Sequence, residues 1–132
     1  MPTPVYPARN SGDQTINYLR APITFALGYT GTKVVGTIPA GCVVLRSYVV
    51  VTTAFNAGST NTLKIGTVAS DASFGTGIAL GTIGVITGGT ALATAATVTP
   101  TADTSVVATS VSTGAAPTAG AGIVVVEYLP VA

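Results

Sequence analysis

The side chains that could perform catalysis or hold a metal are few in this sequence. It has no histidine and a single cysteine, Cys42, so Ser–His and Cys–His nucleophile pairs and the usual zinc sites are excluded. The four acidic residues are far apart in the chain: Asp13, Asp71, Asp103 and Glu127. Two of them could meet in space, as in glycoside hydrolases, but such clefts are generally lined with aromatic residues and this chain has no tryptophan. The sequence therefore predicts no enzymatic activity, no catalytic residue and neither a metal nor a cofactor.

Recognition of phosphate, nucleic acid or membrane is not expected either. Residues 28–33, Gly-Tyr-Thr-Gly-Thr-Lys, resemble a phosphate loop only superficially, because the spacing is wrong and no helix follows. A net charge of +1 leaves no cluster of Lys and Arg for direct binding to nucleic acid. No run of about 18 apolar residues predicts a membrane-spanning helix, and the N-terminus lacks the apolar segment of a signal peptide.

The overall composition is typical of a compact β protein. Of the 132 residues, 48% are hydrophobic and 7% are charged, with Val, Ala and Ile interleaved with Thr and Gly. With one cysteine, an intramolecular disulfide is impossible, which favours synthesis in a reducing cytoplasm and a buried Cys42 thiol. So few charges would leave a free monomer poorly soluble, so we expect copies of the chain or a larger assembly to cover part of its surface.

Residues 42–55 form the predicted central strand, because most of them are β-branched or aromatic and they alternate. At about 3.3 Å per residue this run is longer than most strands, so a bend or a bulge is expected partway along it. The predicted core face consists of Val43, Leu45, Val49, Val51 and Phe55. The predicted outer face consists of Val44, Arg46, Tyr48, Val50 and Thr52.

Turn residues divide the rest of the chain into further strands, without helical periodicity. These are residues 23–29, 33–38, 62–68, 78–87, 90–99, 104–111 and 122–129. Residues 62–68 are expected to return antiparallel to the long strand, with Leu63 and Ile65 inward, and Phe74 is expected to point inward from the next loop. About eight such strands predict an all-β fold for residues 21–132, an antiparallel two-sheet β-sandwich that is jelly-roll-like.

Residues 1–20 differ from the rest and are predicted to be an extended N-terminal arm. Pro2, Pro4 and Pro7 cannot donate hydrogen bonds to a sheet, and residues 10–13, Asn-Ser-Gly-Asp, have the chemistry of a turn. The arm is expected to bind a partner, and a disordered tail is the alternative. Its candidate contact residues are Tyr6, Arg9, Tyr18 and Arg20.

Two charged residues, Arg46 and Glu127, fall inside predicted strands and are flanked by hydrophobic residues. A cross-strand ion pair, or two independent outward charges, is the structural interpretation. Contact with a neighbouring subunit is the functional alternative.

Three stretches carry a resemblance to a known group of proteins. Residues 38–41, Ile-Pro-Ala-Gly, residues 51–67 and residues 118–128 together resemble small structural proteins of tailed bacteriophages. The resemblance implies a capsid decoration, or cement, protein: a β-sandwich that sits as a dimer or trimer on the outer capsid surface of the virion. It further implies binding to the major capsid protein, stabilisation of the shell and synthesis in the host cytoplasm. Other proteins with similar sequences are fibre or tail components, so a module that binds a receptor or a glycan is the alternative.

Overall fold

A computed structural model of the protein describes residues 16–87 and 102–130. Within these ranges the chain forms strands, turns and one short 3-10 helix. The elements in order are β1 (Asn17–Thr24), η3 (Phe25–Leu27), β2 (Thr32–Ile38), β3 (Cys42–Thr53), β4 (Thr60–Thr67), β5 (Gly75–Ala79), β6 (Gly84–Thr87), β7 (Thr104–Thr113) and β8 (Ala121–Pro130).

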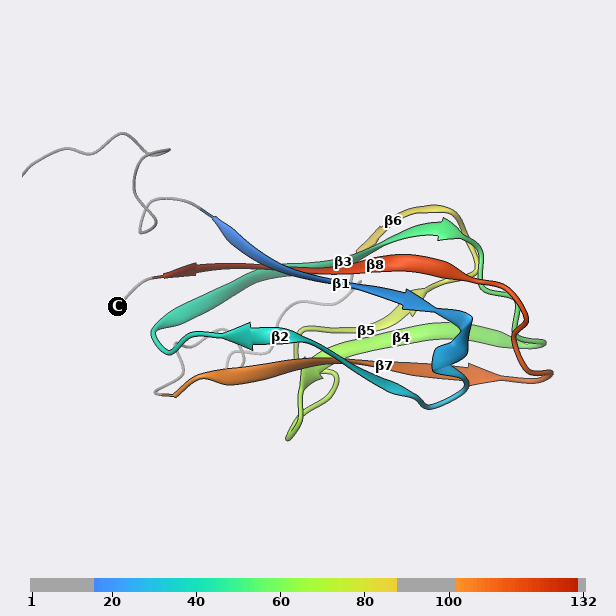
Figure 1. The fold of residues 1–132 in the computed structure, drawn as a ribbon, viewed down its shortest axis with the longest axis horizontal. Coiled ribbons are helices and arrows are strands. Elements are labelled where there is room, and N and C mark those ends of the chain that lie inside the picture. The colour runs from blue at the N-terminus through green and yellow to red at the C-terminus, as the bar shows by residue number, and fades with distance from the viewer. Residues whose placement is uncertain (1–15, 88–101, 131–132) are drawn as a thin grey trace, which may run out of the picture.

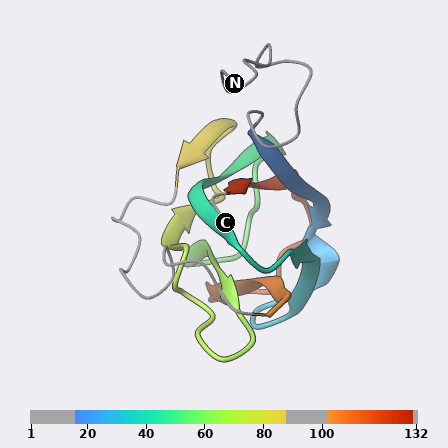
Figure 2. The same ribbon diagram turned by 90° about the vertical axis from the view of Figure 1, so that its left-hand side faces the viewer.

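The strands form two four-stranded antiparallel sheets that lie face to face (Figure 1). Sheet A has the order β1-β8-β3-β6, and sheet B has the order β2-β7-β4-β5. This is the strand order of a jelly roll, in which two Greek keys wrap around one core. Figure 2, which looks roughly along the strands, shows the two layers surrounding that core. The predicted all-β sandwich with jelly-roll-like topology is confirmed.

The core lies between the inner faces of the sheets, where alternate side chains of each strand point. Leu63 and Ile65 of β4 are fully buried and Phe74 is nearly so, as predicted, and Cys42 is a buried free thiol. One hydrogen bond also links the layers through the core, since the Ser47 hydroxyl of β3 donates to the carbonyl of Phe74 at 2.7 Å. The largest fully buried side chains are Ile38, Leu63, Ile65, Ile78, Leu80, Val49, Val51, Val106, Val124 and Val126.

The central strand β3 has the expected irregularity, and it changes which side chains face the core. The pairing with β8 shifts register between Val44 and Arg46, and again between Val51 and Thr53. Leu45 is therefore an extra residue on β3, as in a β-bulge, and the alternation reverses there.

The reversal makes the predicted core face of β3 correct after the bulge and wrong before it. Leu45 is 39% exposed and Val43 is half-buried, whereas Val44, predicted to face outward, is buried. After the bulge the predicted inward residues Val49, Val51 and Phe55 are buried, and Arg46 and Tyr48 lie on the outer face.

The predicted hairpin between the long strand and residues 62–68 is wrong. β4 pairs with β5 and β7 in sheet B, so residues 54–59 carry the chain from one sheet to the other. The Asn61 side chain orders this crossing, because its Oδ1 accepts from the Ala57 amide at 2.7 Å and its Nδ2 donates to the Ala57 carbonyl at 3.1 Å. A short loop here changes sheets where a two-stranded hairpin would stay within one.

The strand predicted at residues 78–87 is two strands that belong to different sheets. β5 ends at Ala79 in sheet B, and β6 begins at Gly84 in sheet A. Leu80 fixes the crossing point, since its amide donates to the Asn61 carbonyl and its carbonyl accepts from the Phe55 amide, both at 2.9 Å.

Two further boundaries at the N-terminal end of the described chain differ from the prediction. The strand expected at residues 23–29 ends at Thr24 and is followed by η3, which closes at Gly28 with a positive φ of 75°. The arm was predicted to end at residue 20, but residues 17–20 already belong to β1 and pair with β8. Residues 1–15 of the arm and the strand predicted at residues 90–99 lie outside the described residues.

Candidate partner-binding face

The outer face of sheet A presents side chains from different strands in rows, because the pairing register sets them side by side. In one row Tyr18 of β1 lies opposite Glu127 of β8, which lies opposite Arg46 of β3. The next row contains Arg20, Val125, Tyr48 and Thr87, and the third contains Pro22, Ile123, Val50 and Val85. The face is thus charged at one end and apolar toward the other.

A groove of about 280 Å³ lies on this face, and we call it the tyrosine groove. Its floor is apolar and comes from the two central strands of sheet A, with Val50 from β3 and Ile123 and Val125 from β8. Its polar side chains are Tyr18, Arg20, Tyr48 and Glu127. An apolar floor with a few polar groups around it is the usual composition of a binding site.

Glu127 is the centre of a polar cluster at one end of the groove. The Arg46 guanidinium donates to both carboxylate oxygens, from Nε to Oε2 and from Nη2 to Oε1 at 3.1 Å. The Tyr48 hydroxyl donates to Oε1 at 3.4 Å, and the Arg46 guanidinium lies 5.4 Å from the centre of the Tyr48 ring. The predicted cross-strand pair is confirmed, and its bidentate geometry holds three side chains in fixed orientations.

The hydrogen bond from Arg46 lowers the pKa of Glu127 from its ordinary value. Partial burial of the carboxyl acts in the opposite direction, and the positive charge of Arg46 and the Tyr48 hydroxyl add to the lowering. The same hydrogen bond and the charge of Glu127 raise the pKa of Arg46. Glu127 is therefore ionised at neutral pH and keeps its charge further into the acid range than a free glutamate.

Glu127→Gln is expected to lower stability at neutral pH by a small amount that disappears in acid. The folded state has the lower pKa, so the stabilisation is present above the unfolded pKa of about 4.3 and is lost as the pH falls through the folded value. The effect should not exceed a few degrees in Tm, because the Arg46 side chain is 65% exposed although that of Glu127 is only 15% exposed. Thermal melting of both proteins from neutral to acid pH measures it. Arg46→Gln should flatten the same pH dependence, and equal differences at every pH would contradict the assignment.

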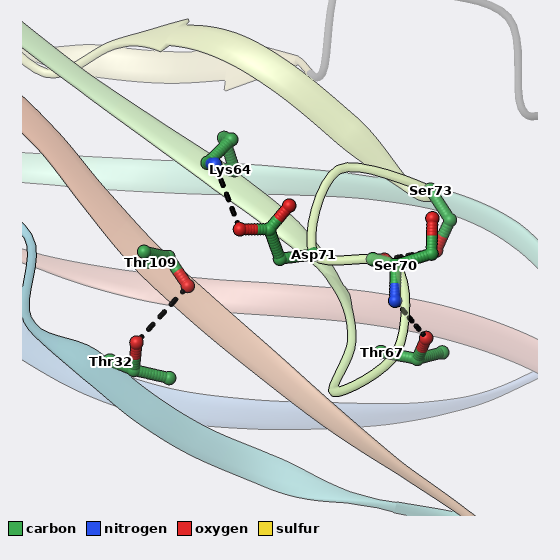
Figure 3. A network of polar contacts seen from close by, with 7 residues as sticks. All are labelled: Thr32, Lys64, Thr67, Ser70, Asp71, Ser73 and Thr109. Carbon is green, nitrogen blue, oxygen red and sulfur yellow. Dashed lines mark hydrogen bonds and ion pairs between the residues drawn. The ribbon is translucent and has the colours of Figure 1, made fainter.

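Several polar side chains on the outer face of sheet B pair with one another (Figure 3), beside the exposed side chains of Val34 and Val111. Thr32 and Thr109 share a hydrogen bond of 3.3 Å across β2 and β7, and the Lys64 ammonium pairs with Asp71 at 2.8 Å. Further along the same face, Thr60 and Thr113 share a hydrogen bond of 2.8 Å. The two outer faces of the sandwich therefore differ, and sheet A carries the apolar groove.

The structure brings two of the four predicted contact residues to this groove. Tyr18 and Arg20 both lie on the outward side of β1, and Tyr18 is 60% exposed. Tyr6 and Arg9 lie outside the described residues. Sequence reasoning did not assign Tyr48, Val50, Ile123 or Val125 to a site. For Glu127 it gave contact with a neighbouring subunit as the alternative to a structural ion pair. The sequence signal that could have identified the unassigned residues is an apolar residue on the outward side of a predicted strand, such as Val50.

The acidic residues occupy separate settings in the part of the chain that the structure describes. Asp71 pairs with Lys64 on the outer face of sheet B, and Glu127 lies on the outer face of sheet A. Asp103 accepts a hydrogen bond from the Ala40 amide at 3.0 Å, and Asp13 falls outside the described residues. No group of three or more His, Cys, Asp or Glu residues that could hold a metal ion occurs within 16–87 and 102–130. Over the same ranges, no helix has the length and apolar character to cross a membrane.

Comparison with known proteins finds a similar fold. No family model matches the chain, and no curated protein matches it in sequence. The structure is similar to a chain in the solved structure described as "Cyanophage Pam1 capsid asymmetric unit", with a TM-score of 0.66. The match covers 87% of this chain and 85% of that chain at 22% sequence identity. At this identity the likeness shows that the two chains share their fold.

Proposed function

We propose that the protein is a virion structural protein that binds the outside of a phage capsid as an oligomer and stabilises the shell. The observation that carries the proposal is the fold shared, over most of both chains, with a chain in a cyanophage capsid asymmetric unit. The major capsid protein and further copies of this chain are its proposed partners. The proposed site is the outer face of sheet A with the tyrosine groove, which offers apolar area and oriented charges for contact.

The stretches that resemble phage structural proteins support the same proposal. Residues 38–41 form the turn into β3, and residues 51–67 contain the crossing from sheet A to sheet B together with β4. Residues 118–128 include most of β8, which lies between β1 and β3. A protein of this kind needs a rigid scaffold and self-association rather than catalysis, because many copies on one lattice multiply a weak individual affinity. We accordingly propose that it has no enzymatic activity.

The second candidate is a fibre or tail module that binds a receptor or a glycan. The tyrosine groove is the observation that favours it, since Tyr18 and Tyr48 offer aromatic rings and hydroxyls beside an apolar floor. Labelling the protein on intact particles separates the two candidates. A label on the capsid surface favours the decoration protein, and a label on the tail favours the fibre module.

Particles that lack the protein are expected to release their genome at a lower temperature and a lower internal pressure than complete particles. Only the assembled lattice presents the binding site, so binding stabilises the shell by linkage. At a free concentration of about 100 times Kd, the gain is about 2.7 kcal/mol for each site. Heating purified particles with and without the protein, and after adding it back, measures the effect. Equal resistance of the two kinds of particle would rule out a cementing role.

A further inference from the structure

We propose that the tyrosine groove binds the N-terminal arm of a second copy of this chain, with residues 4–9, Pro-Val-Tyr-Pro-Ala-Arg, seated along it. The inference is carried by the position of the groove, which has two tyrosines and an apolar floor. The groove lies beside β1, and the proline-rich arm directly precedes β1 in the chain. Self-association of the chain would then depend on exchange of arms.

The groove suits a ligand that contacts side chains and does not form backbone hydrogen bonds with the sheet. Its floor belongs to β3 and β8, and β8 is already hydrogen-bonded to strands on both sides. A bound segment therefore lies across side chains and does not extend the sheet. Proline-rich segments in the polyproline II conformation bind aromatic-lined grooves in this way, because their own backbone is extended and loses little entropy on binding.

The arm has the residue spacing for such a contact. Polyproline II has three residues per turn, so Pro4 and Pro7 would lie on one side of the segment. That spacing lets both prolines face Tyr18 and Tyr48, which line the groove from β1 and β3. Val5 and Tyr6 add apolar area between the two prolines.

The charges of the arm and of the groove are complementary. Arg20 forms no ion pair with any carboxylate in residues 16–87 and 102–130, although it lines the groove. Asp13 of the arm supplies a carboxylate for it. At the other charged position, the Glu127 carboxylate attracts Arg9, and the Arg46 pair already holds this carboxylate in place.

The length of the arm and its point of attachment indicate a second copy as its source. β1 begins at Asn17, and Tyr18 already lines the groove, so the point at which the arm joins sheet A lies beside the groove of the same molecule. At about 3.1 Å per residue, fifteen extended residues reach about 45 Å, enough to cross to a neighbouring molecule. Two copies related by a two-fold axis could each place their arm in the groove of the other. The same contact would then form twice in the dimer. The turn chemistry of residues 10–13 also permits a return onto the arm's own groove, and the test below includes that outcome.

The inference rests on the self-association in the proposed function, but its test needs no capsid. If the arm does not bind the groove, the protein can still stabilise particles. If particles without the protein are equally resistant, the arm can still bind the groove. The first measurement uses protein that lacks residues 1–13 and a labelled peptide of residues 1–15. The truncated protein should melt close to the full chain, because β1 begins at Asn17 and the deletion removes no described strand.

The peptide is expected to bind the truncated protein, and Tyr18→Ala is expected to weaken it by about tenfold or more, as for an aromatic anchor at an interface. Val34→Ala is the matched control, because Val34 is 62% exposed on β2 and does not line the groove. Arg20→Glu should also weaken binding, and a peptide carrying Asp13→Arg should recover it. This recovery would show that the two positions lie close together in the complex.

The second measurement is the oligomeric state of the full chain by sedimentation over a range of concentrations. The full chain is expected to associate. At concentrations where the full chain is still associated, three variants are expected to be dissociated: the truncated chain, Tyr18→Ala and Arg20→Glu. Should the truncated protein fail to fold, the two full-length variants still decide. A peptide that does not bind overturns the proposal, and so does a full chain that stays monomeric at every concentration with its own arm in the groove.

Discussion

Leu63→Ala is expected to lower the free energy of unfolding by about 2–5 kcal/mol, while the same substitution at Leu45 costs less than about 1 kcal/mol. Leu63 lies on β4 between β5 and β7 and is fully buried in the core. Its truncation removes buried methyl groups and leaves a cavity that the two packed sheets close only in part. Leu45 lies at the bulge of β3 and is 39% exposed, so water already reaches its side chain.

The two substitutions form a matched pair, since each deletes the same atoms from a strand. Urea unfolding at equilibrium measures the difference, and the dependence on urea should keep the same slope if neither variant changes the compactness of the folded state. A loss at Leu45 as large as that at Leu63 would mean that β3 continues without a bulge and that Leu45 faces the core. The loss expected from Leu63→Ala is a large share of the stability of a domain of this size, which is only about 5–15 kcal/mol.

Most strands could be located from the sequence because their β-branched and alternating residues are local signals. The position of the bulge could not, because no glycine or proline marks Leu45 and the alternation of apolar residues continues through it. The extra residue is defined by the partner strand: Val44 lies opposite Tyr128, and Arg46 lies opposite Glu127. A property of the pairing between β3 and β8 therefore decided which side chains of β3 face the core.

The sequence pattern around each strand also could not show to which of the two sheets the strand belongs. The loop of residues 54–59 has the length of a hairpin, and residues 78–87 read as one strand, yet each contains a crossing between sheets. Hydrogen bonds between distant positions fix these crossings, such as Phe55 amide to Leu80 carbonyl at 2.9 Å. A jelly roll requires such crossings because, apart from β4 and β5, the successive strands of this chain belong to different sheets and close around one core.

The candidate site could be predicted in part. Tyr18 and Arg20 were candidate contact residues because they lie in a segment of distinctive composition, and both line the groove. Tyr48 and Val50 were placed on the outer face correctly, but nothing local relates them to Ile123, more than seventy positions later in the chain. The groove exists because β8 lies between β1 and β3, so it is a consequence of topology.

Gly66→Ala is expected to destabilise the protein by about 1–3 kcal/mol, the usual range for overpacking a well-packed site. A methyl group on Gly66 would overlap the carbonyl oxygen of Ser70 and lie 2.5 Å from the carbonyl carbon of Asp71. These are backbone atoms of the turn that follows β4 (Figure 3). Hydrogen bonds hold this turn on both sides of Gly66, from the Thr67 amide to Ser70 and from the Phe74 amide to Ile65, each at 2.9 Å.

The turn cannot move away from the new methyl group without breaking one of these bonds or the ion pair between Lys64 and Asp71 at 2.8 Å. Gly81→Ala is the matched control, because a methyl group there comes no closer than 3.9 Å, to the Phe55 carbonyl oxygen, and neither glycine has a positive φ. Replacing glycine at such a permissive position reduces the entropy of the unfolded chain, so Gly81→Ala should be neutral or stabilising by about 0.4–1 kcal/mol. Thermal and urea unfolding of both variants test the contrast. If Gly66→Ala proved as stable as Gly81→Ala, the turn could not be packed against β4 as the structure describes, and the polar face of sheet B would have a different arrangement around Asp71.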